Sequence, residues 1–170
     1  TQNTIKQAAE FGITQGGQRL AGLLFTLAEV HGLGLETAQG LTLTESFYWD
    51  RNDTSREFGN RFKERTGRMP NMIQAGTYSG VLHYLKAIKE AGTDETEAVA
   101  AKMRELPVND AFAENGRVGA NGRMISDVYL LEVKKPEESK GEWDYYNVRA
   151  TIPGDQAYLD PAQSGCPLVE

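Results

Sequence analysis

The sequence is poor in the residues that build disulfide scaffolds, metal centres and membrane spans. It has one cysteine, Cys166, and two histidines among 170 residues, so an internal disulfide is impossible and a thiolate-based metal site is not expected. No apolar run approaches the roughly 18 residues that a transmembrane helix needs. Cys166 is either an inert residue near the end of the chain or a partner for a cysteine in another part of a longer polypeptide, which an oxidising compartment would permit.

Positive charge is also scarce. Eighteen Lys and Arg residues stand against 24 Asp and Glu residues, which gives a net charge of -6. Without a basic stripe to displace counterions from phosphates, nucleic acid is not an expected partner, and an anionic membrane surface is disfavoured for the same reason. At 39% hydrophobic and 25% charged residues, the composition is typical of a soluble globular domain.

The motifs of common enzyme classes are missing as well. There is no GxxxxGK[ST] or GxGxxG loop, and Tyr78-Ser79-Gly80 lacks the first glycine of a nucleophile elbow. Ser79 is better interpreted as a helix cap, and His83 as a histidine on a helix surface. Nothing combines a base, a nucleophile and an oxyanion partner. We therefore expect no enzyme, no cofactor and no metal site.

The N-terminal third alternates helices and strands. Residues 3–11 have a helical pattern that ends at Gly12, and the short apolar run 20–25 predicts a strand buried on both faces of a parallel sheet. A short helix is expected over 27–38. Residues 41–46 alternate in polarity, which predicts a strand with one wetter face.

The middle of the chain is a helical block. Thr54-Ser55-Arg56-Glu57 is interpreted as a capping box for a helix that ends at Gly67. A second helix, capped by Ser79, is expected to bury a stripe of Val81, Leu85 and Ile88. The third opens at Asp94 and is stopped by Pro107.

The period changes to two in the last third. Asn121-Gly122 predicts a tight turn between short strands, and long strands near 128–135 and 143–152 should form an antiparallel ribbon. The tail after Pro153 is expected to be irregular. The chain opens with Thr1 and enters a helical pattern at once, so we interpret it as the interior of a longer polypeptide whose secretory signal, if any, would lie upstream.

One segment stands out as a candidate ligand site. Phe47-Tyr48-Trp49-Asp50 places three aromatic rings and a carboxylate just after a predicted strand end, where ligands gather in open α/β sheets. The alternative is that Phe47 and Trp49 belong to the core and Tyr48 alone is exposed.

Taken together, several stretches resemble the branched-chain amino acid-binding family of periplasmic proteins, which has the type I solute-binding fold. The matching stretches run in family order along essentially the whole chain: Thr4 to Gly12, Gln39-Gly40-Leu41 leading to Phe47-Tyr48-Trp49-Asp50, Phe58 and Phe62 before Gly67 and Pro70, Ala75 to Val81, Glu90 to Asp94, Asn115 to Met124, and Ser164 to Val169. The resemblance corresponds to somewhat less than the C-terminal half of a full family member.

This resemblance implies an α/β fold that is part of a two-lobed protein: a parallel sheet with helices, plus a C-terminal antiparallel ribbon. Residues 1–52 would belong to the second lobe, the helical segment 53–113 to the first lobe, and 114–170 would cross back to the second lobe and form the tail. The implied function is the periplasmic solute-binding component of an ABC importer, which delivers its solute to permease and ATPase subunits. The alternative is a ligand-sensing receptor domain of the same fold.

The resemblance also suggests ligand-binding residues. Carried over to this sequence, they are Tyr48, Trp49 and Asp50 after the crossover strand, Tyr78 at the next helix, and Glu29 or His31 in the loop after Phe25. The ligand would be a small amino acid-like molecule, or an aromatic or other organic acid or amide. Since apolar faces meant for absent strands would be exposed in a partial chain, we expect it to associate with itself or with the missing N-terminal half.

Overall fold

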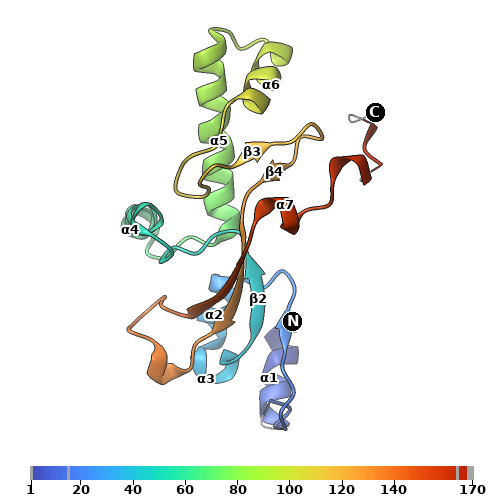
Figure 1. Cartoon of the computed structure of the whole chain (residues 1–170). Coiled ribbons are helices and arrows are strands. Elements are labelled where there is room, and N and C mark those ends of the chain that lie inside the picture. Colours follow the sequence, from blue (N-terminus) through green and yellow to red (C-terminus); the bar gives the residue numbers. More distant parts are fainter. Residues whose placement is uncertain (1, 15, 164, 168–170) are drawn as a thin grey trace.

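The chain forms an elongated molecule in which a sheet with short helices lies at one end and a pair of helices at the other (Figure 1). The computed structural model describes residues 2–14, 16–163 and 165–167. Within these ranges, no helix combines the length and the apolarity that crossing a bilayer requires. The strands of the sheet come from residues 21–45 and 128–152, and the helical end comes from the middle of the sequence.

The N-terminal elements confirm most of the expected pattern. Helix α1 spans Gln2–Glu10 and buries Ile5, and Gly12 follows it with a left-handed φ of 68°. Strand β1 is limited to Ala21–Gly22. The predicted fully buried strand over 20–25 is wrong, because Leu23 and Leu24 are 86% and 87% exposed.

The helix expected over 27–38 is divided in two. Helix α2 spans Leu27–Leu33 and α3 spans Leu35–Ala38. Gly34 separates them with φ 79° and ψ 152°, a conformation outside the helical region that glycine adopts without a steric penalty. Both helices lie beside the sheet (Figure 1), and both contact α1.

A four-stranded sheet pairs strands from the first third of the sequence with strands from the last third. Its order is β1-β2-β5-β6, where β2 is Thr42–Glu45, β5 is Val128–Val133 and β6 is Tyr146–Ile152. β1 and β2 are parallel, whereas β5 runs antiparallel to both β2 and β6. The predicted alternation in β2 is confirmed, since Leu43 and Glu45 are buried and Thr44 is exposed, and so is the β5-β6 ribbon.

The helical block begins where β2 ends. Helix α4 spans Asp53–Thr66 and ends at a left-handed Gly67. Its cap is Asn52, whose side chain accepts from the Ser55 amide while the Ser55 hydroxyl accepts from the Asn52 amide. The predicted box at Thr54 is thus misplaced by two residues, because asparagine is an equally good cap.

Helix α5 differs more from the prediction. It spans Met72–Ala91 with Asn71 as its cap, so Ser79 lies in mid-helix, where its hydroxyl donates to Asp110 Oδ2 at 2.7 Å. His83 is buried, not on the surface, and its Nε2 lies 2.8 Å from the Met103 carbonyl oxygen. The predicted buried stripe is wrong as well, since Val81 and Leu85 are 54% and 55% exposed.

Helix α6 and the short β3-β4 ribbon complete this end. α6 spans Thr96–Glu105, with Glu95 as its cap and Pro107 just beyond it. β3 (Arg117–Val118) and β4 (Met124–Ile125) pair antiparallel around the predicted Asn121-Gly122 turn. After the 3-10 helix Pro136–Glu138 and strand β6 come helix α7 (Gly154–Ala157) and a second 3-10 helix, Pro161–Gln163. Positions 164, 168 and 169 of the stretch Ser164 to Val169, which carries part of the resemblance, lie outside the described residues.

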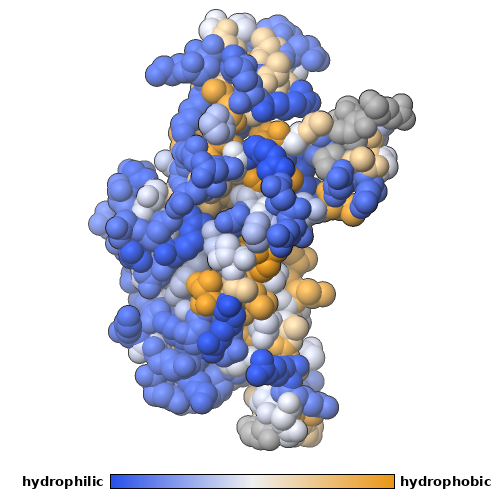
Figure 2. Space-filling model, in the orientation of Figure 1, coloured by the Kyte–Doolittle hydropathy of each residue, from blue (hydrophilic) through white to orange (hydrophobic). Residues whose placement is uncertain are grey.

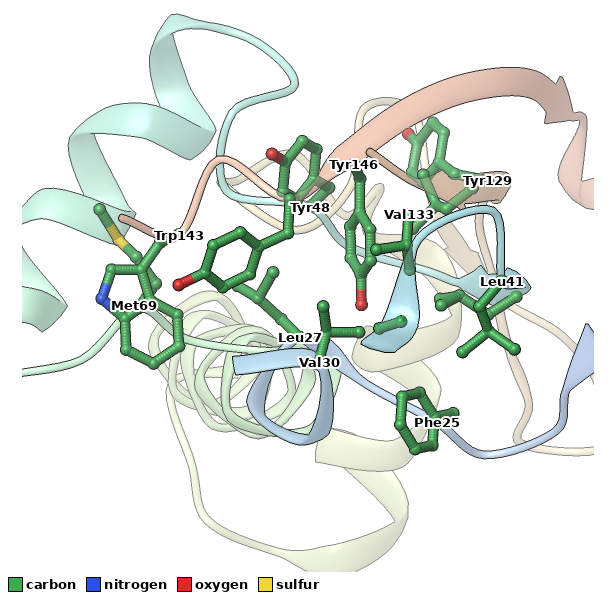
Figure 3. Close-up of a cluster of buried hydrophobic side chains, with 14 of the residues drawn as sticks. Phe25, Leu27, Val30, Leu41, Tyr48, Met69, Tyr129, Val133, Trp143 and Tyr146 are labelled. Carbon is green, nitrogen blue, oxygen red and sulfur yellow. The ribbon is translucent and has the colours of Figure 1, made fainter. Parts of the chain in front are cut away.

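The structure has two hydrophobic cores, and the segment from β2 to Tyr48 contributes to both. The larger one packs the sheet against α1, α2 and α3, and its members include Phe25, Leu27, Val30, Leu41, Tyr48, Met69, Tyr129, Val133, Trp143 and Tyr146 (Figure 3). The second joins α4 and α5 to the segment before β3, and consists of Phe47, Phe58, Ala75, Val108, Ala111, Phe112 and Ala113. Phe47 and Tyr48 are adjacent in sequence but belong to different cores, so the chain passes from one core to the other at this point.

Candidate functional site

The end of β2 and the start of β6 together build an aromatic cluster, which we define as Tyr48, Trp49, Trp143, Tyr145, Tyr146 and His31. The Tyr48 ring lies 5.1 Å from that of Tyr146 and 6.1 Å from that of Trp49. The Trp49 Nε1 donates to the Trp143 carbonyl oxygen at 2.9 Å. Figure 3 shows Tyr48 beside Trp143 and Met69. Segments about a hundred residues apart therefore meet at one edge of the sheet.

A buried charge pair adjoins this cluster. Asp144 forms an ion pair with Lys134, and their side chains are only 10% and 12% exposed. The Tyr48 hydroxyl donates to Asp144 Oδ1 at 3.4 Å, and the Lys140 amide donates to Oδ2 at 2.8 Å. Burial is the largest single influence and raises the pKa of Asp144, but the hydrogen bonds from Lys134, the Lys140 amide and Tyr48, together with the Lys134 charge, outweigh it and lower the pKa below 3.8. Burial, and then the Asp144 charge, raise the pKa of Tyr48, so its hydroxyl keeps its proton.

His31 covers the outer side of the cluster from α2. Its ring stacks on Trp143 with the centroids 3.9 Å apart and an angle of 9° between the planes. Its Nδ1 lies 2.8 Å from the Tyr145 hydroxyl. Trp143 itself has φ 72°, a left-handed conformation that is unfavourable for a large side chain. The aromatic stack and the Trp49 bond hold Trp143 in this conformation.

The remaining sequence-predicted residues lie elsewhere. Glu29 closes a capping box at α2, where its Oε2 accepts from the Thr26 amide at 2.8 Å and the Thr26 hydroxyl at 2.5 Å. Asp50 pairs with Arg56 at 2.9 Å. Tyr78 lies on α5, with its ring 4.8 Å from Phe58, and lines a cavity of about 190 Å³ with Arg61, Phe62 and Arg65. Tyr48, Trp49 and His31 are therefore brought together, whereas Asp50, Glu29 and Tyr78 are not part of the cluster.

The alternative interpretation of the aromatic segment is wrong in one respect. It placed Tyr48 alone at the surface, but Tyr48 is buried with Phe47, and Trp49 is the partly exposed ring. The partners Trp143, Asp144 and Tyr145 escaped the sequence-based reasoning. Their signal was the run of aromatic residues at 143–146, which we interpreted only as an alternating strand.

A second cavity, of about 370 Å³, lies where the chain passes between the cores. Arg51 lines it together with Asn52, Glu114, Asp127, Tyr129 and Thr151. The Arg51 Nη1 donates to the Tyr129 hydroxyl at 2.6 Å and to the Phe112 carbonyl oxygen at 3.2 Å, and its Nη2 donates to the Ala111 carbonyl oxygen at 3.3 Å. The guanidinium also lies 5.1 Å from the centroid of the Tyr129 ring. Arg51 thus ties the second core to strand β5.

The chemistry of these groups suits binding and positioning. Within the aromatic cluster, Trp49 bonds to Trp143 and His31 to Tyr145. The Tyr48 and Tyr146 hydroxyls donate to the buried carboxylates of Asp144 and Glu45. Among the described residues, no three His, Cys, Asp or Glu side chains are grouped closely enough to hold a metal ion. What the cluster offers is flat aromatic surface with hydroxyl and imidazole groups at its edges.

The chain is similar to known proteins in both sequence and structure. The profile of the family described as "Periplasmic binding protein" matches residues 1–142. A solved periplasmic binding protein from Burkholderia mallei is 46% identical with a TM-score of 0.92, and the match covers 99% of this chain and 44% of that one. A branched chain amino acid ABC transporter periplasmic ligand-binding protein from Burkholderia xenovorans is 40% identical with a TM-score of 0.91, and covers 98% and 45%.

A more distant structure supports the fold alone. It is a solute-binding protein of an ABC transporter from Rhodopseudomonas palustris in complex with 3,4-dihydroxybenzoic acid, 20% identical with a TM-score of 0.76, over 95% of this chain and 44% of that one. No curated protein matches the chain. The chain spans less than half the length of each of these three solved structures.

Proposed function

The chain belongs to the periplasmic binding protein family, and from this premise we propose that it is part of the extracytoplasmic solute-binding component of an ABC importer. The fold expected from the sequence, part of the two-lobed type I periplasmic binding protein fold, is confirmed by the similar solved structures. In the proposed role the whole protein closes on a small solute and delivers it to a membrane permease, with no chemical turnover.

The observation that carries this proposal is the pair of cores connected by crossing segments. The chain leaves the larger core after β2, returns into β5, and leaves again after β6 towards α7 (Figure 1). Such crossings supply a hinge about which two bodies close on a ligand. We propose that residues 1–52 belong to the second lobe, 53–113 to the first, and 114–170 to the return crossing, the second lobe and the tail.

We propose an amino acid-like or aromatic acid solute. The relative from Burkholderia xenovorans is described as a branched chain amino acid ABC transporter component, and the aromatic cluster offers rings edged with polar groups to either class. Tyr48, Trp49 and His31 are the proposed contacts within the cluster, and Asp50, Tyr78 and Glu29 are proposed to contribute from the neighbouring segments. The alternative is a ligand-sensing receptor domain of the same fold, which would capture the same solutes but report to a signalling partner.

A thermal-shift screen of the longer polypeptide that carries this chain tests the proposal. The panel should contain branched-chain amino acids, aromatic acids, amides and polyols, each at a saturating concentration. A ligand present at 100 times its Kd stabilises the folded state by about 2.7 kcal/mol, so one class should raise Tm by several degrees. If no class shifts Tm, the proposal fails.

Variants assign the site in the same screen. His31→Ala is exposed enough to leave the fold intact, and Trp49→Ala removes the half-buried ring. Both should lose most of the ligand-induced shift, whereas Glu57→Gln on the exposed face of α4 should keep it. If all three variants keep the full shift, the aromatic cluster is not the binding site.

We propose, further, that an exposed apolar face on α5 is covered by the rest of a longer chain or by a second copy of this one. The face consists of Ile73, Val81, Tyr84 and Leu85, each at least 44% exposed, and Figure 2 shows hydrophobic atoms at the surface over α5. Contiguous patches of this kind are unusual on a monomer. Sedimentation velocity should show the chain associating as its concentration rises, and Val81→Glu with Leu85→Glu should abolish the association. A well-ordered monomer at high concentration would contradict it.

A further inference from the structure

Glu45 is a carboxylate buried between the two cores. It is the last residue of β2 and only 1% exposed. Its neighbours in sequence, Leu43 and Phe47, belong to the larger and the second core respectively. A carboxylate in such a place needs strong hydrogen-bond donors to offset its loss of hydration.

The donors come from three different elements. Glu45 Oε1 accepts from the Leu27 amide at 3.1 Å and from the Tyr146 hydroxyl at 2.8 Å, whereas Oε2 accepts from the Met72 amide at 3.3 Å. Figure 3 shows the Tyr146 hydroxyl pointing towards the start of α2. Leu27 and Met72 are the first residues of α2 and α5, so their amides have no acceptor within their own helices. One carboxylate therefore accepts hydrogen bonds from the first amides of two helices that pack in different cores.

The groups around Glu45 act in opposite directions on its pKa. No lysine or arginine within the described ranges forms an ion pair with it. Glu29 of α2 is the nearby like charge, and Tyr48 packs against Tyr146. Burial is the largest influence and raises the pKa of Glu45, the bonds from Tyr146, Met72 and Leu27 lower it, and the charge of Glu29 raises it; the net pKa is about 7. Glu45 thus changes its charge near neutral pH.

Protonation affects the two oxygens differently. Among the described residues, Oε2 accepts from the Met72 amide alone, at the longest of the three distances. Protonating Oε2 therefore costs fewer and weaker hydrogen bonds than protonating Oε1. A protonated oxygen is a poor acceptor, and the Met72 amide then loses its partner. Oε1 keeps both the Leu27 amide and the Tyr146 hydroxyl.

We propose that Glu45 couples the two cores through a proton-dependent contact: when ionised it holds the start of α5 against β2 and α2, and when protonated it releases α5 while keeping α2 and β6. This role goes beyond solute capture and does not depend on it. It identifies Glu45 as a positioning residue at the crossing between the cores.

The proposal predicts that the Glu45 contribution to the free energy of unfolding and the strength of its contact with the Met72 amide change in opposite directions with pH. Because the folded-state pKa is raised, the Glu45 contribution to stability is fully present below about 4.5 and is lost as the pH rises to about 7. The contact to α5 changes in the other direction and is strongest above pH 7. If the whole fold were simply less stable at one end of the pH range, the free energy of unfolding and the Met72 contact would instead weaken together.

Residue-resolved amide hydrogen exchange between pH 5.5 and 8 tests the proposal, with rates corrected for intrinsic exchange. Losing one hydrogen bond of about 1.4 kcal/mol corresponds to a tenfold change. The protection factor of the Met72 amide should therefore fall about tenfold from pH 8 to pH 5.5, with a midpoint near 7. The Leu27 amide, bonded to the other oxygen, should change much less. Equal changes at both amides, or none at Met72, would overturn the proposal.

Three variants sharpen the test. Glu45→Gln should give low Met72 protection at every pH, since an amide nitrogen replaces one acceptor. Tyr146→Phe should move the midpoint to higher pH, because it removes a donor that favours the charged form. Glu57→Gln, an exposed change on α4, should leave the profile unchanged. If Glu45→Gln fails to fold, Tyr146→Phe still decides: an unshifted midpoint would refute the role of Glu45.

Discussion

Replacing Lys134 with methionine should destabilise the protein by about 3 kcal/mol, because it leaves the Asp144 carboxylate buried without its counter-ion. The Lys134 and Asp144 side chains are 12% and 10% exposed, so water replaces little of the lost interaction. Breaking a buried pair costs about 3–5 kcal/mol. The lower end applies here, since the Lys140 amide and the Tyr48 hydroxyl still donate to the carboxylate.

A double-mutant cycle isolates the interaction of the pair. Asp144→Asn should cost about 2 kcal/mol, because the lysine can extend towards solvent and the asparagine oxygen still accepts from Tyr48. The double variant should be more stable than the sum of the single effects predicts, with a coupling energy of about 2 kcal/mol. Urea unfolding at pH 7, followed by tryptophan fluorescence, measures all four proteins.

The pH dependence provides an independent check. The pKa of Asp144 is lowered from its ordinary 3.8, so its stabilising contribution is present above that value and is lost as the pH falls through the folded-state pKa. The difference in the free energy of unfolding between wild type and Lys134→Met should therefore become smaller below about pH 3.8. A coupling energy near zero, or single effects within 0.5 kcal/mol of zero (about the usual range for surface changes), would refute the reasoning.

Three further changes test other parts of the structure. Between about pH 4.5 and 7, the free energy of unfolding should fall by about 3 kcal/mol more in wild type than in Glu45→Gln, because the raised pKa of Glu45 makes its ionisation costly in the folded state; urea titrations across this range measure it. Phe47→Ala should cost about 4 kcal/mol, since the ring is 1% exposed and packs 5.9 Å from Phe58. Gly67→Ala should cost about 1 kcal/mol, because its φ of 78° strains any residue with a Cβ; chemical denaturation measures both.

Local signals in the sequence predicted the elements well. Glycines at positions 12 and 67 end helices with positive φ, as expected from their place after helical patterns. The Asn121-Gly122 turn and the β5-β6 ribbon follow from turn chemistry and from period-two alternation. These features depend on neighbours in sequence, so they could be derived without knowing the tertiary structure.

The errors in predicted burial concern which partner covers an apolar residue. Leu24 and Val81 are hydrophobic and correctly patterned, yet both are exposed, because a pattern shows which residues favour burial but not whether this chain supplies the covering surface. His83 was missed for the converse reason, since its acceptor lies on α6. At the candidate site, the rings after β2 were identified, but Trp143 and Asp144 were not, because their contacts join segments about a hundred residues apart. Glu29 was predictable as a cap from its spacing to Thr26.

The central claim is that this chain supplies one side of a solute-binding site and that the rest of a longer polypeptide supplies the other. Isothermal calorimetry of the chain and of that polypeptide, with the solute identified by the thermal-shift screen, tests it directly. Losing contacts worth about 4 kcal/mol weakens binding about a thousandfold. The account therefore predicts micromolar or tighter binding to the longer polypeptide and no measurable heat with this chain alone. Micromolar binding to the chain alone would contradict it.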